Sequence, residues 1–280
     1  MDIYQKTQRF YQMATTEKYV IGNSLFGREL YAVKIGQGKP VALAQYAIHG
    51  REFITAELAF EHYAMGLSYG SAWLLPLMNP DGCLLSEVGL SSVTEGKARE
   101  TLLRLNGGER DFSLWKANGR GVDLNVNFDA DWGKGTKNVR YPAPENYVGT
   151  YPFSERETLA LRDFTRFIRP DYTLSYHTKG EEIYWYFHQS ANVAERDKKL
   201  ADALACSTGY PLAQAWGSAG GYKDWCIQKL GIPAFTVETG ADSLQHPIGE
   251  EGKDDVVSHN RNALRDLAAA WQENAALYGG

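Results

Sequence analysis

Two patterns of hydrophobic and polar positions alternate along the chain, and they predict strands and helices. Short apolar runs predict strands covered on both faces, as in a parallel sheet. They occupy residues 39–48, 71–78, 171–177 and 232–240. Helical composition or spacing marks residues 55–65, 154–169, 192–209 and 221–231. Because strand, helix and strand follow one another between residues 39 and 78, we expect a parallel βαβ unit.

Turn and cap signals divide the remaining chain. Residues 18–36 predict two short strands that meet at a turn containing Gly27, and "NPDG" at residues 79–82 predicts another turn. Ser154 in "SERE" fits a capping box at the start of a helix. Two helices have apolar faces at helical spacing, which would lie against the sheet. Their residues are Leu161, Phe164, Phe167 and Ile168 before Pro170, and Leu264, Leu267, Ala268 and Trp271 near the end.

These elements predict one α/β domain over residues 1–280. We expect a central sheet that is mixed but mainly parallel, with helices on both faces. Residues 83–153 are mostly irregular apart from a short helix near residues 95–105. A long irregular segment of this kind is typical of a binding rim.

Composition and charge narrow the class of protein. The 280 residues are 44% hydrophobic and 22% charged, which is ordinary for a globular enzyme. A net charge of -5 argues against nucleic acid or an anionic membrane surface as the partner. No secretory signal and no membrane-spanning run of ~20 apolar residues is recognised. Three cysteines, Cys83, Cys206 and Cys226, lack CxxC spacing, so we expect reduced thiols, a buried Cys226 and a cytoplasmic location.

Polar residues with metal-binding side chains stand at the ends of three predicted strands. His49, His177 and Glu238 lie at or just past these ends, and Glu52 follows His49 by three residues. The crevice beyond the carboxyl ends of parallel strands is the usual site of an α/β fold. Two imidazoles and one carboxylate form a zinc ligand set that leaves a position for water, and a second carboxylate can serve as its base. Taken singly, a histidine at a strand end is more often an ordinary polar residue than a ligand, and the combination in this order is the stronger signal.

Several short motifs occur in an order that resembles the zinc carboxypeptidase family of metallopeptidases. They are "HGRE", "NPDG", "GVDLNVNF", "SYH" and "FTVE", and the resemblance extends from residue 21 onward. Three longer segments resemble the bacterial branch of γ-D-glutamyl–diamino acid peptidases, which cut the stem peptides of peptidoglycan. These segments are "WKANGRGVDLNVNF", "SYHTKGEEIYW" and "GSAGGYKDW".

The resemblance implies roles for the strand-end residues. His49 and Glu52 would bind zinc together with His177, with one zinc ion per chain. Glu238 matches the general acid/base of the family. Asp123 matches the carboxylate that accepts a hydrogen bond from the first histidine ligand and so fixes its tautomer.

A cation is also implied near the oxyanion of the tetrahedral intermediate. The family places an arginine shortly before "GVD", and Lys116 occupies the matching position. Lysine keeps the charge but loses the bidentate fork, and Arg120 is a second candidate.

The sequence departs from the family pattern at the substrate positions. Members that remove C-terminal residues carry "NRN" after "GVD", whose arginine clamps the terminal carboxylate. Here the run is Asn125-Val126-Asn127, so ordinary carboxypeptidase action is not expected, although Asn125 can still contact substrate. Trp216 stands where digestive members have a mobile tyrosine, and Tyr222 lies nearby in sequence without matching that position.

Two lysines favour a substrate with extra carboxylates. Lys223 stands where related enzymes place an acid to bind basic side chains, so we expect it to bind a carboxylate such as that of diaminopimelate. Lys179, two residues after His177, is a candidate for the free α-carboxylate of γ-linked D-glutamate. Both lysines can equally well be solvated surface cations.

We therefore expect a zinc peptidase that hydrolyses the γ-D-glutamyl–diaminopimelate bond of stem peptides, acting on recycled muropeptide fragments. One alternative is a zinc amide deacylase of acidic acyl-amino acids, whose relatives generally keep the "NRN" arginine. The other is a non-catalytic module that binds peptidoglycan fragments. The diamino acid, the stem-peptide length and the oligomeric state stay open.

Overall fold

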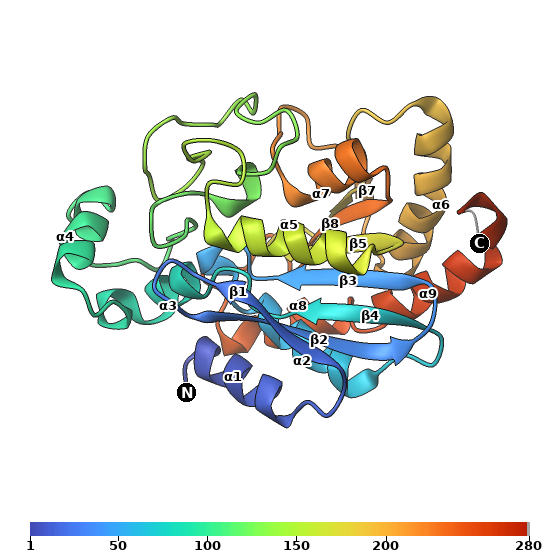
Figure 1. The fold of residues 1–280 in the computed structure, drawn as a ribbon, viewed down its shortest axis with the longest axis horizontal. Coiled ribbons are helices and arrows are strands. Elements are labelled where there is room, and N and C mark those ends of the chain that lie inside the picture. Colours follow the sequence, from blue (N-terminus) through green and yellow to red (C-terminus); the bar gives the residue numbers. More distant parts are fainter. Residues whose placement is uncertain (279–280) are drawn as a thin grey trace.

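An eight-stranded sheet forms the centre of the computed structural model, which describes residues 1–278 (Figure 1). In order across the sheet, the strands are β1 (Lys18–Asn23), β2 (Glu29–Gln37), β4 (Gly70–Leu75), β3 (Val41–Tyr46), β5 (Tyr172–His177), β8 (Ala234–Glu238), β6 (Glu182–Tyr184) and β7 (Leu212–Ala213). Strands β4, β3, β5 and β8 are parallel, β7 is parallel to β6, and β1–β2, β2–β4 and β6–β8 are antiparallel pairs. The predicted mixed, mainly parallel sheet is confirmed.

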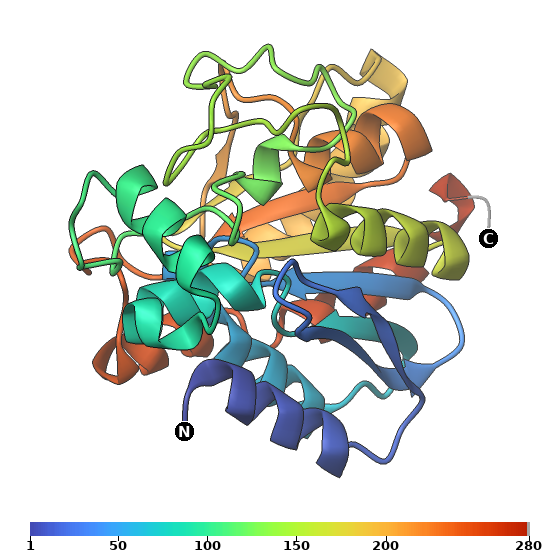
Figure 2. The same ribbon diagram turned by 60° about the vertical axis from the view of Figure 1, so that its left-hand side comes forward.

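Helices cover both faces of this sheet, as predicted (Figures 1 and 2). On one face α2 (Thr55–Met65), α6 (Ala191–Thr208) and α9 (Ala263–Glu273) share a core with the strands. On the other face α5 (Arg156–Ile168) and α7 (Tyr222–Trp225) do the same, and α7 continues as one π-helical turn over Cys226–Leu230. The remaining helices are α1 (Ile3–Met13), α3 (Pro80–Val88), α4 (Gly96–Leu105) and α8 (Lys253–Ser258).

The central strands read as apolar runs because both of their faces are covered. Every residue of β4 and β5 is buried. Tyr46 and Tyr176 lie opposite each other in the register of β3 and β5, and their rings stack with centroids 5.0 Å apart. Cys226 belongs to the core on the opposite face and is fully buried, as predicted, and none of the three cysteines forms a disulfide among the described residues.

Three local predictions differ from the structure. The "NPDG" turn begins helix α3 instead, because Asn79 caps it by accepting the Gly82 N–H (2.9 Å) and Pro80 suits the first helical turn. Ser154 does not cap α5, which begins at Arg156; its hydroxyl bonds to Glu155 (2.7 Å). The predicted C-terminal helical segment is two helices, α8 and α9, of which α9 buries the expected face.

Phe167 was predicted to lie on the buried apolar face of α5, but the structure exposes it. Leu161 and Phe164 are buried against the sheet, whereas Phe167 is 69% exposed. It lies at the margin of the core because α5 lies over the outer strand β1, where the Phe167 ring meets the partly exposed Tyr19 ring (centroids 6.1 Å apart) and the Phe164 ring (6.3 Å).

Among the described residues, no helix is both long enough and apolar enough to cross a membrane bilayer.

A buried acidic group joins α5 to the turn between β1 and β2. Glu157 is 1% exposed, and its Oε1 accepts the Leu25 N–H at 3.3 Å, while Oε2 has no partner among the described residues. Burial raises the pKa of Glu157 to about 8, and the nearby Asp81 charge adds to the effect.

We expect Glu157→Gln to stabilise the protein at alkaline pH. Because its folded-state pKa lies above the ordinary 4.5, the folded chain keeps a proton that the unfolded chain releases. Its contribution to the free energy of unfolding therefore falls as pH rises from 4.5 to about 8. Urea denaturation should show a variant more stable than wild type by on the order of a few kcal/mol at pH 8.5, with the gap closing toward pH 5. An equal gap at both pH values would contradict this assignment.

Candidate functional site

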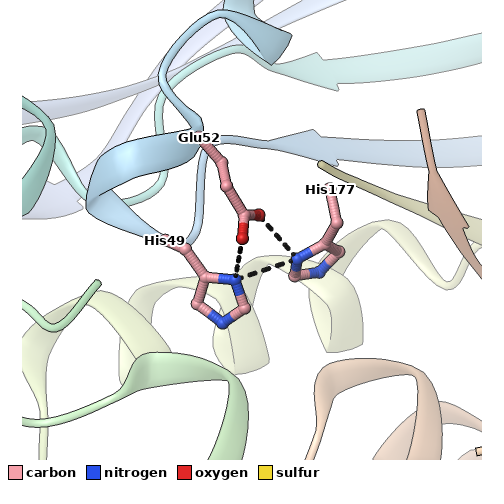
Figure 3. Close-up of side chains that lie close together, drawn as sticks. All are labelled: His49, Glu52 and His177. Carbon is pink, nitrogen blue, oxygen red and sulfur yellow. Dashed lines mark hydrogen bonds and ion pairs between the residues drawn. The ribbon is translucent and has the colours of Figure 1, made fainter. Parts of the chain in front are cut away.

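The predicted zinc ligands form a compact cluster at the carboxyl ends of β3 and β5 (Figure 3). His49 Nδ1 lies 2.9 Å from Glu52 Oε1, and His177 Nδ1 lies 3.0 Å from Glu52 Oε2. The two Nδ1 atoms are 3.1 Å apart. One ligand atom from each residue thus points at a common centre.

The local fold explains how His49 and Glu52 face the same way. A 3-10 turn over Gly50–Glu52 follows the strand, and the Thr55 hydroxyl fixes it by donating to the Glu52 carbonyl and accepting the Ala47 N–H (both 2.9 Å). A Cβ atom at Gly50 would lie 2.5 Å from the Gly82 carbonyl oxygen, so only glycine fits there.

Burial and charge make the cluster suitable for a cation. His49, Glu52 and His177 are 5%, 3% and 1% exposed. Burial alone would raise the pKa of Glu52, but the two imidazoles hold it well below its ordinary value. Two facing imidazole nitrogens and a carboxylate are a donor set that zinc favours. Among the described residues one other group, Glu181, Asp255 and His259, is as close together, but His259 is exposed and none of the three lines the cavity.

Asp123 lies behind His49, as predicted. Its Oδ1 is 3.2 Å from His49 Nε2, an arrangement that leaves Nδ1 free to bind a metal. The carboxylate also pairs with Lys116 Nζ (3.0 Å) and accepts the N–H groups of Asn125 and Asn146 (both 3.1 Å). Burial opposes ionisation, yet Lys116 and His49 keep the pKa of Asp123 well below its ordinary value.

A cavity of about 530 Å³ opens beside the cluster. Its wall includes His49, Lys116 and Glu238, and part of the irregular segment, residues 135–138, forms its rim. The expected role of this segment as a rim fits that position.

Glu238 ends β8 directly beside His177 in the strand register. Burial raises the pKa of Glu238 to about 7, with His177 opposing and the Glu52 charge adding to the increase. A carboxyl group with a pKa near neutrality can both accept and return a proton.

The two candidate cations of the oxyanion site lie in different places. Lys116 lines the cavity, and its ammonium group is paired with Asp123. The side chain of Arg120 is half exposed, lies 3.5 Å from Glu155 and does not line the cavity. The structure therefore brings only Lys116 to the site.

The five residues that were expected to contact substrate also lie in different places. Asn125 and Lys223 line the cavity. Tyr222 is a core residue instead: it is fully buried, and its hydroxyl bonds to Thr165 (2.8 Å). Lys179 bonds to the backbone and the carboxylate of Asp242 and does not line the cavity. The fifth residue, Arg120, does not line the cavity either.

Sequence reasoning missed several polar residues of the cavity wall, among them one on α7 and one on β8. Asp224 follows Lys223 in α7, and Thr236 precedes Glu238 by two residues on β8. Because strand side chains alternate, Thr236 faces the same side as Glu238, so the period of two was a usable signal. Trp216 also lines the cavity, with 84% of its surface exposed.

Comparisons with known proteins agree with this geometry. Residues 3–247 match the model of a family described as zinc carboxypeptidase. The γ-D-glutamyl-L-diamino acid endopeptidase 1 of Lysinibacillus sphaericus is 32% identical over 82% of this chain, which spans 62% of that relative. Bovine thrombin-activatable fibrinolysis inhibitor has a similar fold, with a TM-score of 0.75, 21% identity and 98% of each chain covered. The murein-tripeptide amidase MpaA of Escherichia coli O157 aligns with a TM-score of 0.59 and 22% identity, over 93% of this chain and 95% of that one.

The family match covers far more than half of the chain, and the buried His-Glu-His cluster could hold a metal ion. The chain therefore belongs to the zinc carboxypeptidase family.

Proposed function

We propose that the chain is a zinc-dependent metallopeptidase that hydrolyses the amide bond between γ-linked D-glutamate and a diamino acid, foremost diaminopimelate, in peptidoglycan stem peptides. The observation that carries the proposal is one cavity whose wall includes His49 of the His-Glu-His cluster, Glu238 and Lys223. The 32% identity to a γ-D-glutamyl-L-diamino acid endopeptidase supports the same substrate class.

His49, Glu52 and His177 would hold one zinc ion. Zinc bound there would supply a Lewis acid that polarises the scissile carbonyl and lowers the pKa of a water ligand. Asp123 would orient the His49 ring through Nε2, since the two atoms are 3.2 Å apart.

Glu238 would take the proton from the attacking water and return it to the leaving amine. Its place beside His177, on the cavity wall, supports this role. A pKa of about 7 suits both transfers near neutral pH.

Lys116 would stabilise the negative charge that develops on the carbonyl oxygen. Its ammonium group is held by Asp123 at the cavity wall, so it is oriented before substrate binds.

Asn125 and Val126 do not provide the arginine clamp by which ordinary carboxypeptidases hold a terminal carboxylate. Both line the cavity, and the valine offers no charge to a terminal carboxylate. Asn125 Oδ1 accepts the Tyr222 N–H (3.1 Å) and its Nδ2 lies 3.4 Å from His177 Nε2, so one of its two amide N–H groups is left for substrate. The acyl-amino acid deacylase alternative lacks such support, because its relatives generally keep the arginine. A cytoplasmic location stays a prediction, to be tested by cell fractionation.

We expect His49→Ala to abolish zinc binding, because it removes one of three ligands and opens a gap in the cluster. Plasma mass spectrometry after dialysis should find one zinc per wild-type chain and almost none in the variant. The matched control is His62→Asn, since His62 is equally buried but contacts Tyr46 and the Asn260 carbonyl instead. Full zinc retention by the His49 variant would refute the ligand assignment.

We expect Glu238→Gln to keep zinc and lose turnover by about 10²–10⁴-fold, because the amide cannot shuttle a proton. Zinc-loaded protein would be incubated with L-Ala-γ-D-Glu-meso-diaminopimelate and products followed by mass spectrometry. Free diaminopimelate from wild type only is the expected result. Release by both proteins at equal rates would remove Glu238 from the reaction, whereas release by neither would overturn the proposed substrate.

The wild-type enzyme should also lose kcat/KM on the acidic side of neutrality. Glu238 must be ionised to accept a proton, so the rate rises with pH through its pKa. The pKa of Glu238 is about 7 without a metal. The positive charge of a bound zinc ion lowers this pKa, so the acidic fall of kcat/KM should be centred at or below about pH 7. A profile of kcat/KM from pH 4 to 9 checks the limb, and a flat profile would contradict it.

We expect Lys116→Gln to lower kcat by about 10²–10³-fold, since the developing oxyanion loses its cation. Arg120→Gln is the matched control on the same loop and should change kcat little, because that side chain lies outside the cavity. Lys116→Arg should restore part of the rate. A larger loss in the Arg120 variant would reverse the assignment.

A further inference from the structure

A buried chain of hydrogen bonds runs behind the site, on the face of the sheet opposite the cavity. It begins at Tyr46, the last residue of β3, whose hydroxyl bonds to His62 Nδ1 of α2 (2.6 Å). His62 Nε2 bonds in turn to the Asn260 carbonyl (3.0 Å), and Asn260 Nδ2 donates to Thr239 Oγ1 (2.7 Å). All four residues are at most 2% exposed. The chain of bonds thus links the end of β3 to the residue that follows β8.

The partners determine the direction of every bond in this chain. Burial lowers the pKa of His62 to about 4, so the ring is neutral; Nε2 donates to a carbonyl, and Nδ1 accepts from Tyr46. The Thr239 hydroxyl donates to the Val256 carbonyl (2.8 Å) and therefore accepts from Asn260. Because each member has a specified role, removing one leaves a buried polar atom unpaired.

The end of β8 is fastened by Thr239. Glu238 is the last residue of this strand, and the ends of an element open more easily than its centre. The Thr239 N–H adds one further bond to β5 by donating to the His177 carbonyl (2.9 Å), before the backbone turns away at Gly240 (φ 88°). The Thr239 side chain is held at the same time by α8 and Asn260. One residue therefore holds the strand end through both its backbone and its side chain.

The Glu238 carboxylate has no such fastening of its own. Among the described residues it makes no hydrogen bond and no ion pair, although it lies on the cavity wall. Thr239 does not line the cavity, and its side chain points to the other face of the sheet because strand side chains alternate. The place of the Glu238 carboxylate is thus set by the backbone at the end of β8, which Thr239 holds from behind.

We infer that Thr239 is a positioning residue for Glu238 and that it fixes the end of β8 through Asn260. The rest of the chain, His62 and Tyr46, ties this strand end to the end of β3, which precedes the metal-binding turn. The carboxylate and the ligand cluster then keep a constant separation. This inference rests on the proposed function, because a fixed carboxylate matters to the rate only if Glu238 is the acid/base.

Thr239→Val tests the inference, because valine keeps the shape of the side chain and removes the hydroxyl. With L-Ala-γ-D-Glu-meso-diaminopimelate as substrate, we expect kcat to fall by about 10- to 100-fold while KM changes less than about twofold. A small displacement of the acid/base slows the chemical step more than it weakens binding. Zinc content should stay at that of wild type. Thr239→Ser keeps the hydroxyl and should recover most of the rate.

Thr7→Val is the matched control. Thr7 is also buried, and its hydroxyl donates to a backbone carbonyl, that of Ile3 (2.8 Å), but it lies on α1 and does not line the cavity. We expect this variant to lose stability without losing kcat. A Thr239→Val protein whose kcat per bound zinc equals that of wild type would leave Thr239 with a structural role only and would refute the inference. Thr239→Ala, which leaves room for a water molecule beside Asn260, serves if the valine variant does not fold.

Hydrogen–deuterium exchange separates failure of this inference from failure of the proposed function. Exchange in residues 234–242 would be followed by mass spectrometry in zinc-loaded wild type and in both valine variants. We expect Thr239→Val to speed exchange at this strand end by about 10-fold or more, because the lost bond lowers the cost of local opening. Thr7→Val should leave it unchanged. If wild type cleaves no stem peptide, the proposed function falls, and the exchange still decides the inference: unchanged exchange in Thr239→Val refutes it.

Discussion

The parallel register of three strands is the constraint on which the rest of the site depends. β3, β5 and β8 end at the same edge of the sheet, and His177 and Glu238 are direct neighbours in that register. His49 follows the end of β3 by a few residues, where the turn held by Thr55 brings Glu52 back toward the strand end. A slip of one residue in β8 would turn Glu238 to the opposite face, because strand side chains alternate. The apolar cores on both faces fix this register and so fix the site.

Electrostatics link the cluster to the irregular segment that covers it. Asp123 is fully buried between His49 and Lys116, and a buried carboxylate is stable only when its charges and hydrogen bonds are compensated. The Gly50 N–H donates to the Lys116 carbonyl (2.9 Å), which ties this segment to the metal-binding turn. The cation and the ligand set therefore keep one geometry, although they come from distant parts of the chain.

The candidate metal ligands and the candidate acid/base residue could be predicted because short local sequence patterns mark their positions. Strongly apolar strands and their ends can be recognised in a sequence. The residues next to these ends are His49, Glu52, His177 and Glu238. Substrate contacts were predicted less well, since the direction of a helical side chain depends on packing. Tyr222 and Lys223 are neighbours on α7, yet the first is in the core and the second lines the cavity. The pairing of Lys223 with Asp224, whose charged atoms lie 2.6 Å apart, had no sequence signal that separates it from two ordinary surface charges.

Chemistry and specificity come from different kinds of element in this fold. The cluster and Glu238 sit on strand ends, whose position the sheet fixes, whereas the rim at residues 135–138 and helix α7 supply the rest of the cavity wall. Changes in α7 or the rim can alter the charge of the cavity without moving the ligands, because neither element pairs with β3 or β5 in the sheet. The Lys223–Asp224 pair illustrates this independence: it is held by the Gly221 N–H and the Tyr186 carbonyl, and neither residue belongs to β3 or β5. The charges of this wall can thus differ while the register that positions His49 and His177 stays the same.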